Sequence, residues 1–324
     1  MNTRLSDQGI RLREFRREDI PAMVDISNRT WPDDPTTIEN EEYFEKTYPP
    51  DNPRLRYAVE NSQGQFIGVG TCLLPFWIAA PGVYMMWITV DPDWRQCGVG
   101  QALLAEFEPY ARQQGAEKLW TDCREDMACS IRFLERAEFT NYGLRFESEL
   151  DLTTFDEAHF AGAVDRVLNA DFEIANLADE CAITPEAEQL VYQLDRSVQD
   201  DIPRPGGARS NMDFDTFRKV YVDNPEADPS AILIAKHRGQ YAGYTAVWLG
   251  KDKPAYTAMT GVRREYRGQG LALALKLLSF RLMKERGYSA ARTNNDTANQ
   301  PILHLNEKLG YQKQPGMLLW EKLL

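Results

Sequence analysis

Hydrophobic positions along the chain follow one order of strand and helix periods twice. In the first half they predict, in order, a strand at 9–15, a helix opening near Asp19 and Pro21, a hairpin at 55–74, a strand at 84–90, a helix ending near Gly115, a strand at 117–123 and a helix at 130–137. In the second half they predict a strand at 172–177, a helix at 184–198, a hairpin at 231–249, a strand at 255–262, a long helix, a strand at 289–295 and a helix at 301–310. The pattern therefore predicts two copies of one α/β fold.

Each long helix follows a glycine-containing loop, and these loops align the two copies. Arg95 and Gly98 stand in the first loop as Arg267 and Gly270 stand in the second, each in the pattern RxxG, one further residue and a small residue. The same offset of 172 positions pairs Val90 with Val262, Leu103 with Leu275, Thr121 with Thr293 and Phe139 with Tyr311. A period this long fits two whole domains. We predict domains at 1–150 and 170–324, joined by a linker with one short helix at 151–169.

Residues 68–90 carry no charge and resemble a membrane span in composition alone. Pro75 and the pair Pro81-Gly82 divide this stretch into two short segments, which favours buried strands joined by a turn over a transmembrane helix. We expect no membrane association. The aromatic residues of this region either line a pocket or fill the core, and core packing is the favoured interpretation; they are Phe76, Trp77, Tyr84 and Trp87.

The net charge, the cysteines and the histidines indicate which compartment and which classes of ligand to expect. The net charge of −12 disfavours nucleic acid, because phosphate binding needs a basic face, and it is compatible with a cationic substrate. The five cysteines are odd in number and form no CxxC pair, and the first residues contain no apolar leader segment, so we expect a cytoplasmic protein with free thiols. The three histidines lack a metal-ligand spacing, and we predict no metal.

The glycine loops are candidate anion sites. The first turn of a helix has unpaired backbone N–H groups and the positive end of the helix dipole, and glycine lets a ligand approach them. The alternative is a plain turn between a strand and a helix, which the second copy of the motif makes less favoured. A dinucleotide fingerprint is excluded, because Leu103 and Leu273 stand where its last glycine is required, and neither loop contains a GxxxxGK motif.

The pattern RxxGxG or RxxGxA, between a strand ending in valine and an amphipathic helix, resembles the GNAT superfamily of N-acetyltransferases. Residues 260–311 carry the strongest part of this resemblance, since "TNNDTANQPILHLNEKLGY" is similar to the later segment of that family. The order and spacing of the two copies are similar to tandem two-domain members such as mycothiol synthase. The resemblance implies two tandem folds, each a mostly antiparallel sheet with a splayed strand pair flanked by helices.

The resemblance also implies acetyl-CoA as co-substrate, with its pyrophosphate on the glycine loop. In the second copy it assigns coenzyme contacts to Val262, Arg267, Gly268, Gln269, Gly270, Leu271, Ala272 and Asn299. In the first copy the corresponding loop positions are Val90, Arg95, Gln96, Cys97, Gly98, Val99 and Gly100. Each of the loop arginines, Arg95 and Arg267, either binds a phosphate or is a solvated side chain beside the loop.

The implied reaction is direct acetyl transfer to a primary amine through an oxyanion held by a strand amide. Many family members carry a tyrosine that protonates the thiolate, where this chain has Asn306 in the second copy and Leu134 in the first. The first copy departs further at Met127 and Glu138. We therefore expect the domain at 170–324 to be the catalytic one.

For the acceptor, Asp201 or Asp200 is a candidate to attract an ammonium group or to orient a water that removes its proton, although turn chemistry is the favoured interpretation of aspartates there. We expect an enzyme that acetylates a small-molecule amine, as a monomer or homodimer. The alternative is a non-catalytic acyl-CoA-binding or regulatory protein built from two degenerate copies.

Overall fold

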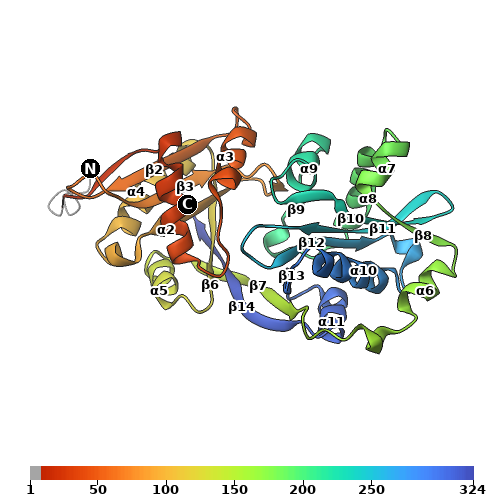
Figure 1. Ribbon diagram of the computed structural model, residues 1–324. Coiled ribbons are helices and arrows are strands. Elements are labelled where there is room, and N and C mark those ends of the chain that lie inside the picture. The colour runs from red at the N-terminus through yellow and green to blue at the C-terminus, as the bar shows by residue number, and fades with distance from the viewer. Residues whose placement is uncertain (1–8) are drawn as a thin grey trace. The chain divides into compact units, whose positions relative to one another are not determined.

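The computed structural model describes residues 9–324, which divide into two compact units. Unit 1 comprises the described residues through Leu144 together with Met317–Leu324, and unit 2 comprises Arg145–Gly316. The boundary expected at residue 150 thus falls inside unit 2, and the end of the chain, expected in the second domain, lies in unit 1. Figure 1 shows the C-terminus among the elements of unit 1.

Unit 1 begins with a hairpin-rich half and ends with the glycine-loop helix and its partners. Its elements are β1 (Arg11–Glu14), η1 (Arg17–Asp19), α2 (Ile20–Thr30), α3 (Ile38–Thr47), β2 (Arg54–Glu60), β3 (Phe66–Leu73), β4 (Ile78–Ala79), β5 (Val83–Val90), η2 (Pro92–Trp94), α4 (Val99–Gln113), β6 (Lys118–Arg124) and α5 (Ala128–Arg136). Strand β7 (Thr140–Asp151) leads from unit 1 into unit 2.

Unit 2 repeats this order with additional helices near its start. Its elements are η3 (Glu157–Phe160), α6 (Ala163–Leu168), β8 (Phe172–Asn176), α7 (Leu177–Ile183), α8 (Ala187–Gln199), η4 (Pro205–Gly207), β9 (Arg209–Ser210), α9 (Phe214–Tyr221), β10 (Ala227–His237), β11 (Gln240–Trp248), β12 (Ala255–Val262), η5 (Arg264–Tyr266), α10 (Leu271–Glu285), β13 (Ala290–Asp296) and α11 (Gln300–Lys308). Strand β14 (Gln312–Leu323) returns to unit 1.

The two units have the same sheet topology. The strand order is β1-β2-β3-β5-β6-β14 in unit 1 and β8-β10-β11-β12-β13-β7 in unit 2. In each sheet the pair that flanks the glycine loop, β5 with β6 or β12 with β13, is parallel, and every other neighbouring pair is antiparallel. The expected fold, a mostly antiparallel sheet with one exceptional strand pair in each copy, is confirmed.

The last strand of each sheet comes from the other half of the chain. Residues 145–151 of β7, which follow the helices of unit 1, pair with β13. Residues 317–323 of β14, which follow the helices of unit 2, pair with β6. Each copy therefore receives the strand beside β6 or β13 from the other half of the chain, an arrangement that the repeat alone did not predict.

The uncharged stretch at 68–90 forms β3, β4 and β5, as its prolines indicated. Within residues 9–324, none of the helices combines the length and the apolar character that crossing a bilayer requires. The expected linker contains η3 and α6, and α6 is anchored, since Ala163 and Val167 are buried in the core of unit 2. Helices α3, α7 and α9 were not expected from the sequence.

The exchanged strand β14 generates a prediction for unit 1. Trp320 is 5% exposed and packs in the core of unit 1, whereas Leu323 on the same strand is 70% exposed. Replacing Trp320 with alanine removes a large buried ring, so Trp320→Ala is expected to cost about 3–5 kcal/mol of stability. Amide hydrogen exchange should report this loss in peptides from β6. Equal losses in β6 and β13 peptides, or none in either, would contradict the assignment, and Leu323→Ala should leave protection unchanged.

Candidate functional site

A cavity in unit 1 lies where its two parallel strands separate. The register between β5 and β6 covers Val83 to Met85 opposite Lys118 to Trp120 in the described chain. Past this point a cavity of about 830 Å³ is lined by β5, β6, the first turns of α4, helix α5 and the end of α2. The backbone edges of the diverging strands therefore face the cavity instead of each other.

The first turn of α4 opens onto this cavity without a side-chain cap. Gly98 is the N-cap of α4 in the left-handed region, with φ of 86°, and it has no side chain that could accept the first amides. By contrast, Thr37 caps α3 by accepting a hydrogen bond from the Asn40 amide. The amides at the start of α4 have no intrahelical acceptor and lie at the positive end of a 15-residue helix. The amides of this turn are therefore able to donate hydrogen bonds to a bound anion.

Two loop positions show why small or unusual residues occur there. A Cβ added to Gly100 would lie 3.1 Å from the Phe133 ring, so the small residue admits packing of α5 against α4. Gln96 adopts φ of 65°, in the position that Gly268 occupies with φ of 76° in unit 2. A non-glycine residue in this region is uncommon and is held by its surroundings.

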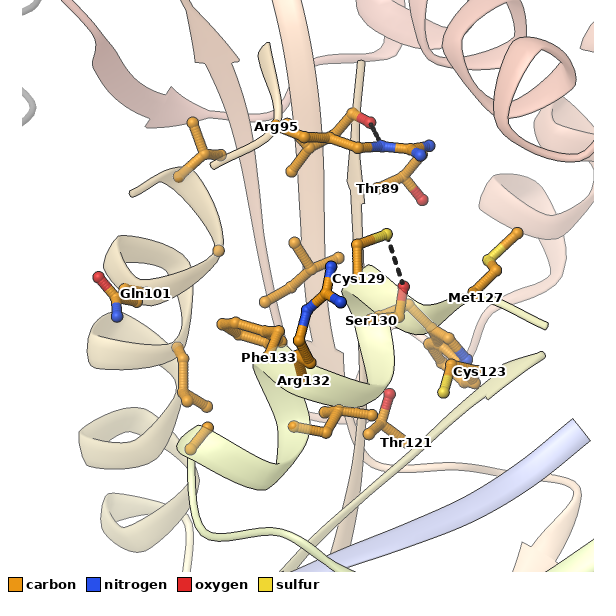
Figure 2. A pocket seen from close by; sticks show the side chains of 18 of the residues that line it. Thr89, Arg95, Gln101, Thr121, Cys123, Met127, Cys129, Ser130, Arg132 and Phe133 are labelled. Carbon is orange, nitrogen blue, oxygen red and sulfur yellow. Dashed lines mark hydrogen bonds between the residues drawn. The ribbon is translucent and has the colours of Figure 1, made fainter. Parts of the chain in front are cut away.

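Three arginines line the cavity and give it a basic wall. Arg95 donates from Nε to the Val90 carbonyl at 3.3 Å and from Nη2 to Thr30 Oγ1 at 3.5 Å. Arg132 and Arg136 lie on α5, and within residues 9–324 neither has an ion-pair partner. Figure 2 shows Arg132 and Phe133 extending from α5, with Arg95 nearby. Uncompensated like charges around a helix N-terminus favour a bound anion.

Sequence reasoning missed Arg132 and Arg136. They are four residues apart on a short helix and therefore share one face. That spacing was a usable signal, but exposed arginines are more often solvated. Of the residues assigned to the first loop, those lining the cavity are Val90, Arg95, Gln96, Gly98, Val99 and Gly100. Cys97 instead packs against the core of unit 1, with Sγ 3.6 Å from the Arg95 carbonyl.

The remaining wall is apolar or sulfur-containing. Met127 and Leu134, two of the three positions where the first copy departs from the family pattern, line the cavity, and the third, Glu138, is not among its lining residues. Cys129 does too, and its Sγ lies 4.0 Å from Ser130 Oγ. Trp87 also lines the cavity, whereas Tyr84 is buried in the core of unit 1. Of the aromatic residues in the uncharged stretch, one therefore lines a pocket and another fills the core, as the two interpretations of the sequence allowed. Within residues 9–324 no His, Cys, Asp or Glu group is arranged to hold a metal.

Unit 2 repeats the loop geometry. Gly270 is the N-cap of α10 with φ of 83°, and Arg267 Nε donates to the Val262 carbonyl at 3.0 Å, as Arg95 does to Val90. Leu271 and Ala272 pack with the unit 2 core. Gln269 Nε2 donates to the Glu265 carbonyl at 3.5 Å, and Asn299 begins α11 without capping it through its side chain.

Asp201 binds the arginines of this second loop. Its carboxylate accepts from Arg264 Nε at 2.9 Å and from Arg267 Nη2 at 2.5 Å. The hydrogen bonds from Arg264 and Arg267 hold the pKa of the Asp201 carboxyl well below its ordinary range. A carboxylate kept ionised by two guanidinium groups is a weak proton acceptor, so this geometry is the opposite of what a general base needs. We therefore interpret Asp201 as a partner of the loop arginines and not as a general base.

The interior of unit 2 contains polar side chains where unit 1 has leucines. Lys276 and Asn306 stand at the positions of the cavity-lining Leu104 and Leu134, and they are 1% and 3% exposed. Among the described residues, neither the Lys276 Nζ nor the Asn306 amide has a hydrogen-bond partner. The Lys276 Nζ lies 5.0 Å from the centre of the Tyr311 ring. Burial lowers the pKa of Lys276 to about 7.

Comparison with known proteins gives a consistent result. A sequence model described as "Acetyltransferase (GNAT) family" matches residues 20–139 and 199–311. A mycothiol acetyltransferase from Thermobifida fusca is 23% identical over 261 residues, covering 72% of this chain and 71% of that protein. A mycothiol acetyltransferase from Thermomonospora curvata is 28% identical over 89 residues; the match covers 28% of this chain and only 30% of that relative's length.

A solved structure shares the tandem fold. It is described as a "tandem GNAT protein from the clavulanic acid biosynthesis pathway", with a TM-score of 0.73 and 18% identity. The superposition covers 97% of this chain and 98% of that one. At this identity the likeness concerns the fold.

The buried Lys276 generates a prediction about pH. Its folded pKa is lowered to about 7, so between about pH 7 and pH 10 the unfolded chain binds more protons, and stability rises with pH. Lys276→Leu, which installs the residue found at Leu104, should remove up to about 1.4 kcal/mol per pH unit of this slope and stabilise the protein near neutral pH. Urea unfolding at several pH values measures both effects. Lys284→Leu, at an exposed site on α10, is the control, and parallel profiles for the native chain and Lys276→Leu would refute the prediction.

Proposed function

We propose, because this chain belongs to the acetyltransferase (GNAT) family and carries two of its domains in tandem, that it is an N-acetyltransferase moving the acetyl group of acetyl-CoA to a small-molecule amine. The observation that carries this proposal is the unit 1 cavity. It joins an uncapped helix N-terminus, three arginines and a gap between diverging strands. The acidic chain, with a net charge of −12, suits an amine acceptor better than nucleic acid.

The residues of unit 1 fit acetyl-CoA at two points. The first-turn amides of α4, with Arg95, Arg132 and Arg136, supply donors and positive charge for phosphate groups. The open edges of β5 and β6 supply backbone donors and acceptors for an extended amide-containing arm. Cys97 is not required as a nucleophile, since it packs against the core.

The chemistry is direct transfer. When bound, acetyl-CoA supplies a thioester: the neutral amine nitrogen bonds to its acetyl carbon, the C–S bond breaks with its electron pair going to sulfur, and the proton lost from nitrogen passes to solvent. In this proposal a backbone amide at the open edge of β5 would donate to the developing oxyanion. Leu134 provides no acid for the sulfur, but a thiol with an ordinary pKa of about 8.5 leaves readily as thiolate.

The loop arginines of the two units differ in their partners, although the sequence assigned coenzyme contacts to both loops. In unit 1 the loop arginine Arg95 has no ion-pair partner among the described residues, whereas in unit 2 Asp201 occupies Arg267. We therefore propose unit 1 as the principal acetyl-CoA site. This proposal differs from the expectation that the domain at 170–324 is catalytic, and the titration described below tests the two against each other. The free cysteines of the described chain suit a reducing compartment such as the cytoplasm.

One observation favours a second candidate function. Leu134 and Met127 leave the cavity wall without an acid or a helix-leading asparagine, which suits a protein that binds acyl-CoA without turning it over. The two functions differ in one measurable quantity, the amine-dependent release of coenzyme A detected by mass spectrometry. Binding without release for any amine would favour the regulatory protein.

The site assignment predicts which arginine controls coenzyme affinity. Arg132→Glu should weaken acetyl-CoA binding at least about tenfold, because it replaces a charge-assisted contact with repulsion. His304→Glu places a glutamate at the equivalent exposed position of unit 2, and Arg112→Glu makes the same charge reversal at the far end of α4. Isothermal titration should find these two within about twofold of the native chain. The reverse ranking would place the site in unit 2, and no binding to the native chain would overturn the proposed function.

A further inference from the structure

The interior of unit 2 differs from that of unit 1 at two matched helix positions. Leu104 is the sixth residue of the 15-residue helix α4, and Lys276 is the sixth residue of the 15-residue helix α10. In the same way, Leu134 and Asn306 are the seventh residues of α5 and α11. Both leucines line the unit 1 cavity beside the separating strands. Lys276 and Asn306 therefore occupy the corresponding positions beside the separation of β12 and β13.

Tyr311 connects these two polar helix positions. It stands where unit 1 has the buried Phe139, and it is itself 7% exposed. The Lys276 Nζ lies 5.0 Å from the centre of the Tyr311 ring, and the Tyr311 backbone amide donates to the Asn306 carbonyl at 3.0 Å. Three apolar side chains of unit 1 thus correspond to three polar ones that lie together in the interior of unit 2.

The side chains of Lys276 and Asn306 have hydrogen-bonding atoms that no protein group uses. Among residues 9–324, the Lys276 Nζ and both amide atoms of Asn306 lack a partner, and burial is what lowers the pKa of Lys276. Buried polar groups in native proteins are nearly always paired, because an unpaired one in an apolar interior is costly. These two side chains, 1% and 3% exposed, therefore lack the partners that their burial calls for.

A carboxylate supplies the kind of partner that these side chains lack. A lysine ammonium donates hydrogen bonds and accepts none, and an asparagine amide adds further N–H donors. A carboxylate offers several lone pairs to such donors and is also a counter-ion for the ammonium, which makes the contact a strong one. An acetyl group ends in a methyl and offers neither, so the leucines of unit 1 suit it better than the polar interior of unit 2.

The first turn of α10 provides a place for a second anionic group. Gly270 begins this helix without a side-chain cap, as Gly98 begins α4. Asp201 pairs with both Arg264 and Arg267, so these three side chains together keep one positive charge. A ligand that reaches both the first turn and the interior therefore carries phosphate at one end and a carboxylate at the other. An acyl-CoA with a dicarboxylic acyl group has both.

We propose that unit 2 is a second acyl-CoA site and that it selects an acyl group ending in a carboxylate, with Lys276 as the counter-ion and Asn306 as a further donor. This inference goes beyond the proposed function, which places acetyl-CoA in unit 1. The coenzyme arm lies between β12 and β13, which in the described chain share register only at Ala255 and Tyr256. The flexible stem of Lys276 lets its ammonium turn from the Tyr311 ring to the carboxylate.

The test compares two acyl groups of equal chain length. Succinyl-CoA and butyryl-CoA differ in that only the succinyl group ends in a carboxylate. Isothermal titration is performed on the full-length chain carrying Arg132→Glu, in which coenzyme binding by unit 1 is weakened. Succinyl-CoA should bind at least about tenfold more tightly than butyryl-CoA, because it gains a charge-assisted contact. Equal affinities, or tighter binding of butyryl-CoA, would overturn the inference.

Lys276→Leu in the same chain installs the side chain of Leu104 and removes the charge. It should weaken succinyl-CoA binding at least about tenfold and leave butyryl-CoA binding within about twofold, so that the two affinities converge. Lys284→Leu makes the same change at an exposed position of α10 and should alter neither affinity. An unchanged succinyl-CoA affinity in Lys276→Leu, or an equal loss for both acyl-CoAs, would overturn the inference.

Acetyl-CoA separates the fate of this inference from that of the proposed function. If Arg132→Glu weakens acetyl-CoA binding but succinyl-CoA binding does not depend on Lys276, the inference is overturned and the proposed function stands. If succinyl-CoA binding depends on Lys276 but the native chain does not bind acetyl-CoA, the proposed function fails and the inference stands.

Discussion

The separation of one parallel strand pair is the constraint on which the rest of each unit depends. β5 and β6 share register only over Val83 to Met85, and β12 and β13 share it only at Ala255 and Tyr256 in the described chain. Backbone groups at a strand edge need partners, so the separation creates polar edges that face a space. The glycine loop starts its helix at the same place. Without the separation, the uncapped amides of α4 would face a closed sheet and the loop would only reverse the chain.

The two copies place different chemistry on this shared backbone. In unit 1 the positions around the separation are occupied by Leu104 and Leu134, and the loop arginine Arg95 has no carboxylate partner among the described residues. In unit 2 the same positions hold Lys276 and Asn306, both buried, while Asp201 neutralises the arginine. The apolar wall is the simpler one for a thioester arm, because it leaves no buried polar atom without a partner. The two copies therefore share the backbone geometry of the loop but differ in the polarity of the side chains behind it.

The repeat, the glycine loops and the order of elements along the chain could be predicted because periodicity and glycine spacing are local signals. Helix α3 was missed because it buries no residue, and α7 because it has only seven residues; α9 was missed although Phe217 and Tyr221, four residues apart, mark its buried face. The destination of β7 could not be predicted, because an alternating strand has the same pattern whether it joins β6 or β13. Arg132 and Arg136 were missed because an exposed arginine reveals its role only when the surrounding charges are known. Gly100 illustrates the same limit, since its neighbour Phe133 is distant in sequence.

The exchange of β7 and β14 between the units also sets the order in which the chain can finish folding on the ribosome. β6 is synthesised early, but its antiparallel neighbour, residues 317–323, emerges only after all of unit 2 has been made. Until then one edge of the unit 1 sheet is open, and an open edge is a template for pairing with other chains. The nascent chain therefore exposes this edge of β6 throughout translation of its second half, and the sheet of unit 1 is completed last.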